Sequence, residues 1–508
     1  MKSDIPIQMV EDAQPSTDNT ISNAELADEA QAGKVEVAPP EHDPAVVRRF
    51  LWKCDIRLIP CLGIMYLLNS LDRANLGNAK TDGLEKDLGL VGNQYNQILT
   101  YYYIPYVLCG PGMAIITRLI TAKYSLTGMM VFFGSFSIAT AFAKNFGQLL
   151  AFRLFIGVFE SGFLASVVIY MSGFWTRADI ASRIGLFFAS NVIASAFGGL
   201  LAYGTFQINA TRLHGWSYLF IIEGSLTVFF AIVMCLYIPR RLTSAHFLTA
   251  EEKAAGVARQ LSDSVDEVDG KFSWSQALIE LKSWHTYVRI LICFSISVPL
   301  ASNNNFLAPM VARLGYGTAK TNLYTVAPAL TAAVFLVAWC FSSDRFRERG
   351  LHLCAALLVT TIGYVVLITI DVDNLAASYV ALFLTTVGAY PVSPLFSSWC
   401  VSNLPNMNSR AFTIGLLIPM GNLSGFLVSN IFINAEAPRY ITALRVNLAF
   451  AVLAIVLCFS YGMWMRYENR RRDRISGRIT TLDNHGHGQE YITDGVLTAK
   501  DPRFRFMA

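Results

Sequence analysis

A cluster of charged and polar side chains interrupts an apolar stretch near the start of the chain. The sequence LNSLDRANLGNAK at 68–80 holds Asp72, Arg73 and Asn75, and it follows residues that are almost wholly apolar from Ile56 onward. An arginine can hold a carboxylate through two parallel hydrogen bonds, and a buried carboxyl group can take up and release a proton. Inside a membrane each charge costs about 2.5 to 3.5 kcal/mol on insertion scales, so it must face protein or a wet cavity. These residues are therefore candidates for a polar site inside the membrane.

An alternative is that the apolar segment ends at Leu71 and that the polar residues form an outer loop. A helix that starts near Arg57 rises about 1.5 Å per residue, which places Asp72 past the bilayer centre but still near hydrocarbon depth. No cluster of turn-forming residues occurs before Gly83. The sequence therefore favours a helix that continues through Asp72 and Arg73.

A second charged pair lies in the apolar sequence AFRLFIGVFESGFLASVVIY at 151–170. Arg153 and Glu160 are seven residues apart, so they lie on one face of a helix. Burial favours the neutral form of a carboxyl group and a nearby arginine favours its charged form, so Glu160 can be switched between them. Glu160 is therefore the best single candidate for a proton carrier. A permanently paired, purely structural arginine and glutamate is the alternative.

A run of three asparagines occupies the equivalent place in the second half of the chain. The first and seventh apolar segments begin about 230 residues apart, and this offset carries Asn75 onto Asn305 in PLASNNNFLAP. Two repeats that meet at a central site are typical of membrane transporters. We therefore expect Asn303, Asn304 and Asn305 to face the first segment across a cavity and, with Asn75, to bind substrate.

The elements that position these residues follow from the composition. Of the 508 residues, 54% are hydrophobic and only 15% are charged, and the mean hydropathy of +0.43 exceeds what a soluble core needs. A helix needs about 20 apolar residues to cross the ~30 Å hydrocarbon core, and the apolar runs lack the alternation of a membrane β-strand. This pattern predicts an all-α integral membrane protein with twelve transmembrane helices in two six-helix halves around a central cavity. The spans lie at 56–76, 94–118, 124–142, 148–173, 183–206, 216–238, 285–312, 321–341, 351–371, 375–402, 410–433 and 442–466.

The segments around these spans complete the predicted organisation. It consists of an acidic N-terminal tail at 1–54, a first half at 55–238, a linker at 239–284, a second half at 285–466 and a C-terminal tail at 467–508. Lysines and arginines flank the first span and follow the sixth and twelfth, so both termini and the linker are expected in the cytoplasm. No cleavable secretory signal precedes the first span. We expect a monomeric, multi-pass protein of the plasma membrane, surrounded by the lipid bilayer.

The linker carries two patterns that are typical of helix starts. TAEE at 249–252 and SWSQ at 273–276 have the spacing of capping boxes. Trp274, Leu278 and Leu281 then recur at helical spacing. These patterns favour an amphipathic helix that lies on the membrane surface, and a merely solvated linker is the alternative.

One glycosylation sequon bears on the orientation. NAT at 209–211 lies in the connection between the fifth and sixth spans, which the assignment places outside the cell. It is the only such sequon in a predicted outer loop. We therefore expect Asn209 to carry a glycan.

Other kinds of chemistry find little support in the sequence. The nine cysteines lie in or beside spans, without a Cys-x-x-Cys pair, and are typical of small apolar packing residues. His485 and His487 lie in the polar tail, where histidines are usually solvated. There is no Gly-x-x-x-x-Gly-Lys-Ser/Thr loop and no set of nucleophile, base and orienting group. We expect no enzyme activity, cofactor, metal or nucleic acid partner.

Several longer motifs resemble a known family. The order of six helices, a loop and six helices, with SDRFRERG at 343–350 after the eighth span, is similar to the major facilitator superfamily. Further motifs resemble the fungal anion:cation symporters of the allantoate, nicotinate and pantothenate permease type, and this resemblance spans nearly the whole chain. They are LDRANLGNAK, RLFIGVFESG, GWSYLFIIEG, NNFLAPMVARLGY, APRY and the ending DPRFRF.

This resemblance implies proton-coupled symport of a small organic anion, either a vitamin or a carboxylate metabolite, by alternating access. It implies that Asp72 and Glu160 carry protons. It also implies that Arg73 and Arg153 act in substrate binding and coupling. The substrate class comes from the resemblance alone, because burial and spacing do not supply it.

The resemblance also points to a gating loop and leaves two other functions to weigh. The loop after the eighth span is expected to gate the cavity through Asp344, Arg345 and Arg349. Exporters that work by proton antiport usually carry Gly-Pro-x-x-Gly-Gly in the fifth span, whereas SAFGG at 195–199 lacks the proline. A non-transporting nutrient receptor typically adds a long signalling extension, and both tails are short. Symport is therefore favoured, with export of a drug or secondary metabolite by proton antiport as the alternative.

Overall fold

The computed structural model describes residues 43–206, 208, 213–263, 272–312, 318–371, 374–432, 436, 439–476 and 504–508. Within these ranges every regular element is a helix. Asn209 lies outside the described residues, and so does the side chain of Asn305. The expectation that Asn209 is glycosylated therefore stays a prediction.

The first half of the chain folds into six spans. The fourth span consists of two helices, α6 and α7, that follow each other almost directly. The helices of this half are α2 (Pro44–Thr81), α3 (Leu84–Asp87), α4 (Gln94–Ile120), α5 (Ala122–Thr140), α6 (Phe146–Glu160), α7 (Phe163–Ser172), α8 (Ile180–Phe206) and α9 (Gly215–Tyr237).

The second half repeats this arrangement. Its tenth and eleventh spans in chain order are each divided into two helices, so the described chain has twelve spans, as predicted. The helices are α12 (Trp284–Ala312), α13 (Thr318–Phe346), α14 (Gly350–Thr369), α15 (Leu375–Ala389), α16 (Val392–Ser402), α17 (Met407–Asn422), α18 (Ser424–Ile431) and α19 (Ile441–Ser476). By length and composition alone, ten helices of the described chain qualify as membrane-crossing, and α8 contains a further apolar stretch, Ile180–Ala194.

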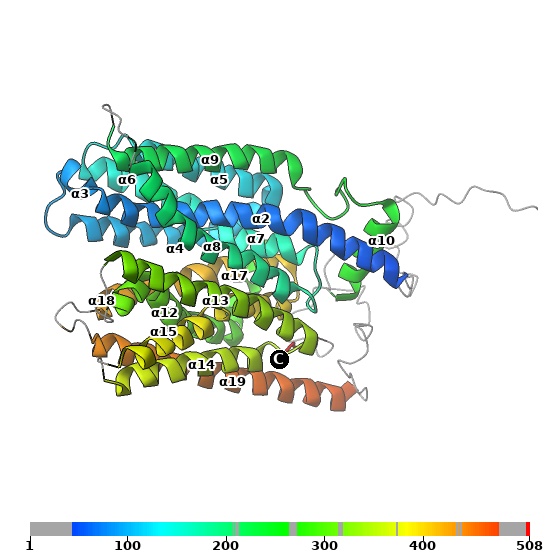
Figure 1. Cartoon of the computed structure of the whole chain (residues 1–508). Coiled ribbons are helices and arrows are strands. Elements are labelled where there is room, and N and C mark those ends of the chain that lie inside the picture. Colours follow the sequence, from blue (N-terminus) through cyan, green and yellow to red (C-terminus); the bar gives the residue numbers. More distant parts are fainter. Residues whose placement is uncertain are drawn as a thin grey trace, which may run out of the picture.

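The two halves lie against each other as separate layers (Figure 1). The helix α10 (Ala250–Asp263) and the end of α19 lie at the same end of the bundle. We call this end the linker side. The short helix α3 marks the opposite end.

The first helix is long enough to carry the polar residues into the bundle. The side chain of Asp43 caps its start, and Pro44 occupies the first turn, where no backbone N–H is needed. The helix runs for 38 residues to Thr81, just before Gly83, whose positive φ of 91° suits a glycine. The polar stretch is therefore helical, and the alternative of an outer loop after Leu71 is wrong.

Two glycines let α4 approach the fourth span closely. A Cβ atom on Gly157 would lie 2.7 Å from the backbone oxygen of Tyr102, and one on Gly162 would lie 2.3 Å from the Cβ of Met113. Real Cβ atoms do not come so close, so only glycine fits. This close packing brings the side chain of Tyr102 beside Glu160 at the end of α6.

The linker forms one of its two predicted capping boxes. Glu252 N donates to Thr249 Oγ1 at 3.3 Å, and Thr249 N donates to Glu252 Oε2 at 2.9 Å, at the start of α10. Burial raises the pKa of Glu252, but hydrogen bonds from Lys53 and Thr249 lower this pKa more, to below its ordinary value. A helix, α11 (Trp274–Leu278), also begins at the second pattern, but the capping box itself does not form. Ser273 makes no capping bond, and its hydroxyl group lies 2.8 Å from that of Ser275.

Small residues also set the spacing between the two halves. A Cβ on Gly110 of α4 would lie 2.4 Å from Cγ of Pro419 in α17, and one on Gly415 would lie 2.6 Å from Cβ of Ala114. On the other seam, a Cβ on Gly185 of α8 would lie 2.8 Å from Cys340 of α13 in the second half. Contact between the halves therefore depends on the absence of side chains at these positions.

We predict that Gly110→Ala destabilises the closed arrangement of the halves. The new methyl group would clash with the rigid ring of Pro419, and overpacking of this kind costs about 1 to 3 kcal/mol. The melting temperature of the purified protein should fall. Gly112→Ala on the same helix is the control, because nothing lies within 4 Å of its Cβ position. Equal melting temperatures for the two variants would contradict this account of the seam.

Candidate functional site

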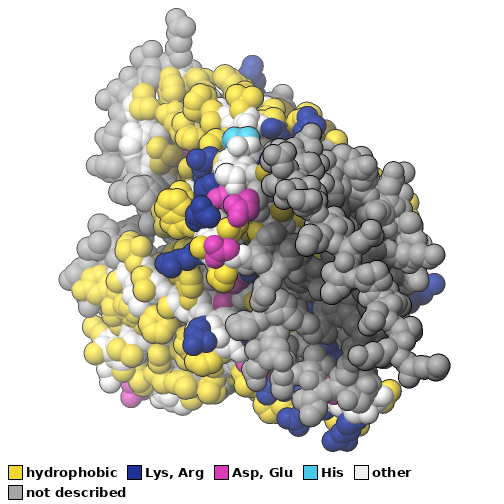
Figure 2. All heavy atoms as spheres, turned by 90° about the vertical axis from the view of Figure 1, so that its right-hand side faces the viewer, with side chains coloured by type: hydrophobic (Ala, Val, Ile, Leu, Met, Phe, Trp, Pro, Cys, Tyr) yellow, Lys and Arg dark blue, Asp and Glu magenta, His cyan; other side chains and the backbone are white. Residues whose placement is uncertain are grey.

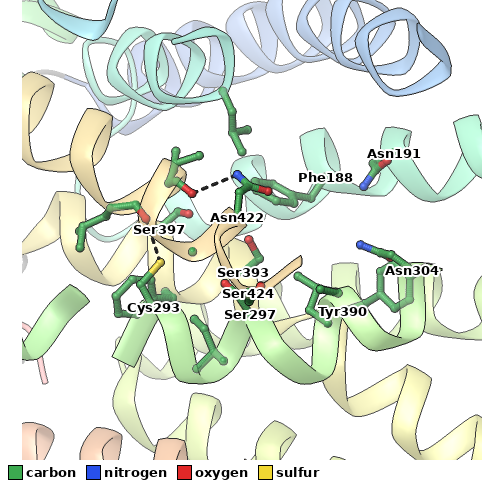
Figure 3. A pocket seen from close by; sticks show the side chains of 18 of the residues that line it. Phe188, Asn191, Cys293, Ser297, Asn304, Tyr390, Ser393, Ser397, Asn422 and Ser424 are labelled. Carbon is green, nitrogen blue, oxygen red and sulfur yellow. Dashed lines mark hydrogen bonds between the residues drawn. The ribbon is translucent and has the colours of Figure 1, made fainter. Parts of the chain in front are cut away.

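A cavity of about 150 Å³ lies between the halves. Arg73 of α2 is the only charged residue among the described residues that line it. The remaining polar lining residues carry amide or hydroxyl groups. Figure 3 shows Asn191 of α8 and Asn304 of α12 extending toward each other from opposite sides of this cavity. The cavity can therefore offer one positive charge and several uncharged hydrogen-bonding groups to a ligand.

Arg73 is held at the cavity wall by two neighbours. Its Nε lies 3.2 Å from Glu160 Oε2, and its Nη2 donates to the hydroxyl group of Tyr106 at 2.9 Å. The guanidinium carbon also lies 4.9 Å from the centre of the Tyr106 ring. Because 35% of the Arg73 side chain stays exposed, a ligand in the cavity can reach it.

Glu160 is completely buried and accepts hydrogen bonds from several side chains. Asn69 Nδ2 donates to Oε1 at 2.7 Å, and Oε2 accepts from the hydroxyl group of Tyr102 as well as from Arg73. The pairing with Arg153 that the sequence suggested is not formed. Glu160 instead pairs with Arg73 of the neighbouring helix α2.

Asp72 faces away from the cavity. Successive residues of a helix point about 100° apart, so Arg73 reaches the cavity while Asp72 points into the first half. There its Oδ1 accepts a hydrogen bond from Ser137 of α5 at 2.6 Å, and only 3% of the residue is exposed. Arg73 therefore lines the cavity, whereas Asp72, its neighbour in the sequence, lies in the interior of the first half.

Arg153 and Asn75 lie in the same interior of the first half. The guanidinium carbon of Arg153 is 5.6 Å from the centre of the Phe220 ring, and the residue is 4% exposed. Arg153 interacts electrostatically with Asp72 and, more weakly, with Glu160. Asn75 is fully buried. Neither residue is among those lining the cavity.

Glu223 of α9 is a buried carboxyl group that the sequence interpretation did not assign to the site. It accepts a hydrogen bond from Asn75 and is 1% exposed. The signal was present in the sequence, because Glu223 is the only acidic residue of the apolar run 216–238. An acidic residue at membrane depth needs an explanation.

The three asparagines of α12 have different surroundings. Asn304 lines the cavity, as expected. Asn303 is 1% exposed, and its Nδ2 donates to the backbone oxygens of Pro299 at 3.0 Å and Thr385 at 3.3 Å. It therefore joins α12 to α15 instead of facing the cavity.

Several uncharged polar lining residues were missed by the sequence interpretation. They share no spacing pattern and are small, so nothing in the sequence distinguishes them from packing residues. Those that Figure 3 labels on the second half are Ser297, Ser393, Ser397, Asn422 and Ser424.

The expected gating loop joins the two halves on the linker side. Asp344, at the end of α13, accepts hydrogen bonds from the backbone N–H groups of Ala181 at 3.2 Å and Ser182 at 2.6 Å, in the first turn of α8. A carboxylate at a helix N-terminus is favourable because the helix dipole is positive there. The buried Arg349 donates to Asp344 at 2.5 Å, whereas Arg345 is exposed.

A second group of contacts closes the same side. Arg349 Nη2 donates to the backbone oxygen of Arg177 at 2.8 Å, and Arg177 Nη1 donates to that of Ser402 at 3.2 Å. The helices α7 and α8 of the first half also pack against α16 of the second. In Figure 2, which views this side, acidic and basic side chains lie next to each other along the middle of the face. The cavity is therefore closed toward the linker side by contacts between the halves.

The segment 504–508 docks onto this closed side. Met507 N donates to Asn403 Oδ1 at 2.8 Å, and Trp399 Nε1 donates to the backbone oxygen of Met507 at 2.8 Å. Phe506 is fully buried. The guanidinium carbon of Arg177, from the first half, lies 5.6 Å from the centre of the Phe504 ring. The segment therefore touches both halves.

The sequence pattern of the Major Facilitator Superfamily matches residues 62–429, which include the cavity and the linker-side contacts. The chain belongs to the major facilitator superfamily. It is therefore a multi-pass membrane transporter, and its relatives are transporters and not enzymes.

Three relatives of this superfamily member illustrate its similarity to fungal transporters. The MFS-type transporter efuF of Hormonema carpetanum is 42% identical over 454 residues, covering 89% of this chain and 92% of the relative. The major facilitator-type transporter hxnP of Emericella nidulans is 38% identical, covering 90% and 93%. The high-affinity nicotinic acid transporter of Saccharomyces cerevisiae is 30% identical, covering 93% and 86%. These likenesses confirm the resemblance to fungal transporters of the superfamily.

Solved structures confirm the fold. The proton:xylose symporter XylE, bound to 6-bromo-6-deoxy-D-glucose, matches with a TM-score of 0.65 at 14% identity and covers 81% of this chain and 96% of its own. The human organic anion transporter MFSD10 matches with a TM-score of 0.58 at 14% identity, covering 80% and 99%. At such identities the likeness shows the major facilitator fold alone.

We predict that Asp344→Asn loosens the linker side. The variant keeps the shape of the side chain but loses the charge that favours the N-terminus of α8, which is worth about 1 kcal/mol, or roughly a fivefold change in the open population. Cys340 is fully buried at this seam, so its alkylation in the native protein should become faster. Arg345→Gln, at an exposed neighbour, should leave the rate unchanged. Equal rates for both variants would show that Asp344 does not hold the seam.

Proposed function

We propose that this transporter is a symporter that carries a small organic anion, a vitamin or a carboxylate metabolite, together with protons. The observation that carries the proposal is that Arg73 is the only charge among the described residues lining the cavity. A guanidinium group suits a carboxylate because the two can share parallel hydrogen bonds. One relative, the nicotinic acid transporter of Saccharomyces cerevisiae, is named for a compound that has a carboxyl group.

The pairing of Arg73 with Glu160 suggests how proton and anion binding are coupled. While Glu160 is charged, it neutralises Arg73 and competes with an incoming carboxylate for the guanidinium group. When Glu160 takes up a proton, Arg73 keeps its charge without a partner in a largely apolar site. An anion can then replace the glutamate. Proton and anion therefore bind together, which is what symport requires.

The energetics favour proton coupling for an anion. Moving one charge through 100 mV costs about 2.3 kcal/mol, so a monoanion enters an inside-negative cell uphill. One proton makes the cycle electroneutral, and a second makes the membrane potential a driving force. Proton antiport that exports a metabolite is the alternative, and the direction of the pH dependence distinguishes the two.

The remaining residues of the proposed site act at two distances from the substrate. Asn304 is proposed to contact the anion directly from the second half, since it lines the cavity. Asn75, Asn303 and Arg153 are proposed to act from behind the cavity wall, by positioning α2, α12 and α6. Asn305 stays a proposed substrate contact from the asparagine run.

The setting of the transporter in the cell is also proposed. The excess of lysine and arginine beside the first, sixth and twelfth spans supports a cytoplasmic linker side, with both termini there and Asn209 outside as a glycosylation site. Asp344 and Arg349 would then form the inner gate, with the exposed Arg345 at its edge. We propose that the protein works as a monomer in the plasma membrane.

The function is tested by uptake of radiolabelled nicotinic acid and a panel of other carboxylates into cells, at pH 5 and pH 7.5. Arg73→Lys should raise the KM for the anion about tenfold or more, because an ammonium group cannot make two parallel hydrogen bonds. Arg73→Ala should nearly abolish uptake while the protein still reaches the membrane. An unchanged KM in Arg73→Lys would show that the anion is recognised elsewhere.

The proton role of Glu160 calls for a separate experiment. Glu160→Gln mimics the protonated residue, so it should strongly weaken proton-driven accumulation but spare exchange of anion between the two sides. Anion binding should also lose the part of its pH dependence that Glu160 supplies. A purely structural glutamate predicts instead that accumulation and exchange fail together, with less folded protein in the membrane. Normal pH-driven accumulation by this variant would disprove the role.

A further inference from the structure

A second pair of carboxyl groups lies inside the first half, away from Glu160. Asp72 of α2 is 3% exposed and Glu223 of α9 is 1% exposed. Asn75 lies one helical turn beyond Asp72 on α2 and donates a hydrogen bond to Glu223. The two carboxyl groups therefore lie within about one turn of each other, on helices that pack directly together.

The charges in this region do not balance when both groups are ionised. Arg73 already neutralises Glu160. The only further cation that acts on Asp72 among the described residues is Arg153, which is 4% exposed. Two carboxylates against one arginine leave a net negative charge buried in the bilayer, which is strongly unfavourable. One bound proton removes this charge.

The other elements that pack against Glu223 do not supply a second cation. α5 contributes the hydroxyl group of Ser137, which is bound to Asp72, and its Lys123 lies at the linker-side end. α8 contributes Arg183, whose guanidinium group is bound to Asp55 at 2.7 Å near the same end. Among the described residues, Asp72 is the charged group that acts on Glu223.

Polar atoms without a hydrogen-bond partner also support a bound proton in this region. Each carboxyl group has one oxygen bound, to Ser137 or to Asn75, and one oxygen, Asp72 Oδ2 or Glu223 Oε1, without a partner among the described residues. Asn75 Oδ1 also has no hydrogen-bond partner among the described residues, and neither do Nε and Nη2 of Arg153. The free oxygens of the two carboxyl groups could therefore bind a proton. After the proton leaves, the free N–H groups of Arg153 could donate hydrogen bonds to a carboxylate.

We propose that Asp72 and Glu223 form a shared proton-binding site inside the first half, with Arg153 as its counter-charge and Asn75 as the link between them. The proposal rests on the proposed symport function and extends it, because this site is separate from Glu160. When the proton is bound, one of the two carboxyl groups is neutral and can itself donate a hydrogen bond. When the proton leaves, Asp72 is stabilised by Arg153, and Glu223 by the hydrogen bond from Asn75. A transporter that uses both sites would move two protons with each anion.

Infrared spectroscopy of the purified protein in lipid vesicles tests the site without any substrate. A buried, protonated carboxyl group gives its own C=O stretching band, distinct from that of a carboxylate. At neutral pH we expect this band in the wild-type protein and in Glu160→Gln. Glu223→Gln should remove it, because the remaining carboxylate, Asp72, is then neutralised by Arg153.

Two results would overturn the proposal: no such band in the wild-type protein, or a band that survives in Glu223→Gln. A band that disappears only in Glu160→Gln would assign the proton to the cavity and likewise overturn it. Failure of nicotinic acid uptake would count against the symport function but not against this site. Conversely, the absence of the band would leave coupling through Glu160 intact.

A measurement of stoichiometry then connects the site to transport. With nicotinic acid as the probe, the wild-type protein in vesicles should take up about two protons per anion, and Glu223→Gln should take up about one. The number of protons per anion is a ratio, so it does not depend on how much folded protein each preparation contains. An equal ratio in both proteins would show that the proton at this site does not travel with the anion.

Discussion

The ion pair between Arg73 and Glu160 determines much of the surrounding architecture. An arginine and a carboxylate can be kept at membrane depth only if each satisfies the other and if polar neighbours bind their remaining atoms. Asn69, Tyr102 and Tyr106 supply those neighbours from α2 and α4. The glycine contacts between α4 and the fourth span bring the tyrosines of α4 close to Glu160 and Arg73. The close packing of α2, α4 and α6 therefore makes this one buried ion pair possible.

The helical geometry of α2 divides two tasks between adjacent residues. Arg73 reaches the cavity, while Asp72 and Asn75 turn toward α5 and α9. A ligand can therefore meet a positive charge without also meeting the carboxyl group next to it in the sequence. Because both residues belong to one rigid helix, any movement of α2 during the transport cycle would shift the surroundings of both together.

The sequence predicted the features that depend on single residues or on length, and it missed those that depend on pairing in space. Apolar runs of the right length predict twelve spans, and a charge at membrane depth marks Arg73 and Glu160. The sequence did not predict that Arg73 is the partner of Glu160, because Arg73 lies on another helix. The short distance along α6 suggested Arg153 instead. Glu223 carried the same signal of an acid in an apolar run but was read only as part of a motif. The capping box at Ser273 shows that spacing alone does not ensure a bond.

The docked segment 504–508 bears on how the protein is assembled during its synthesis. This segment follows all twelve spans in the chain, and its binding site combines Trp399 and Asn403 of the second half with Arg177 of the first. That surface is complete only once both halves have been inserted and packed together. Its docking would thus come at the end of biogenesis, and the burial of Phe506 would distinguish a finished transporter from one whose halves have not yet joined.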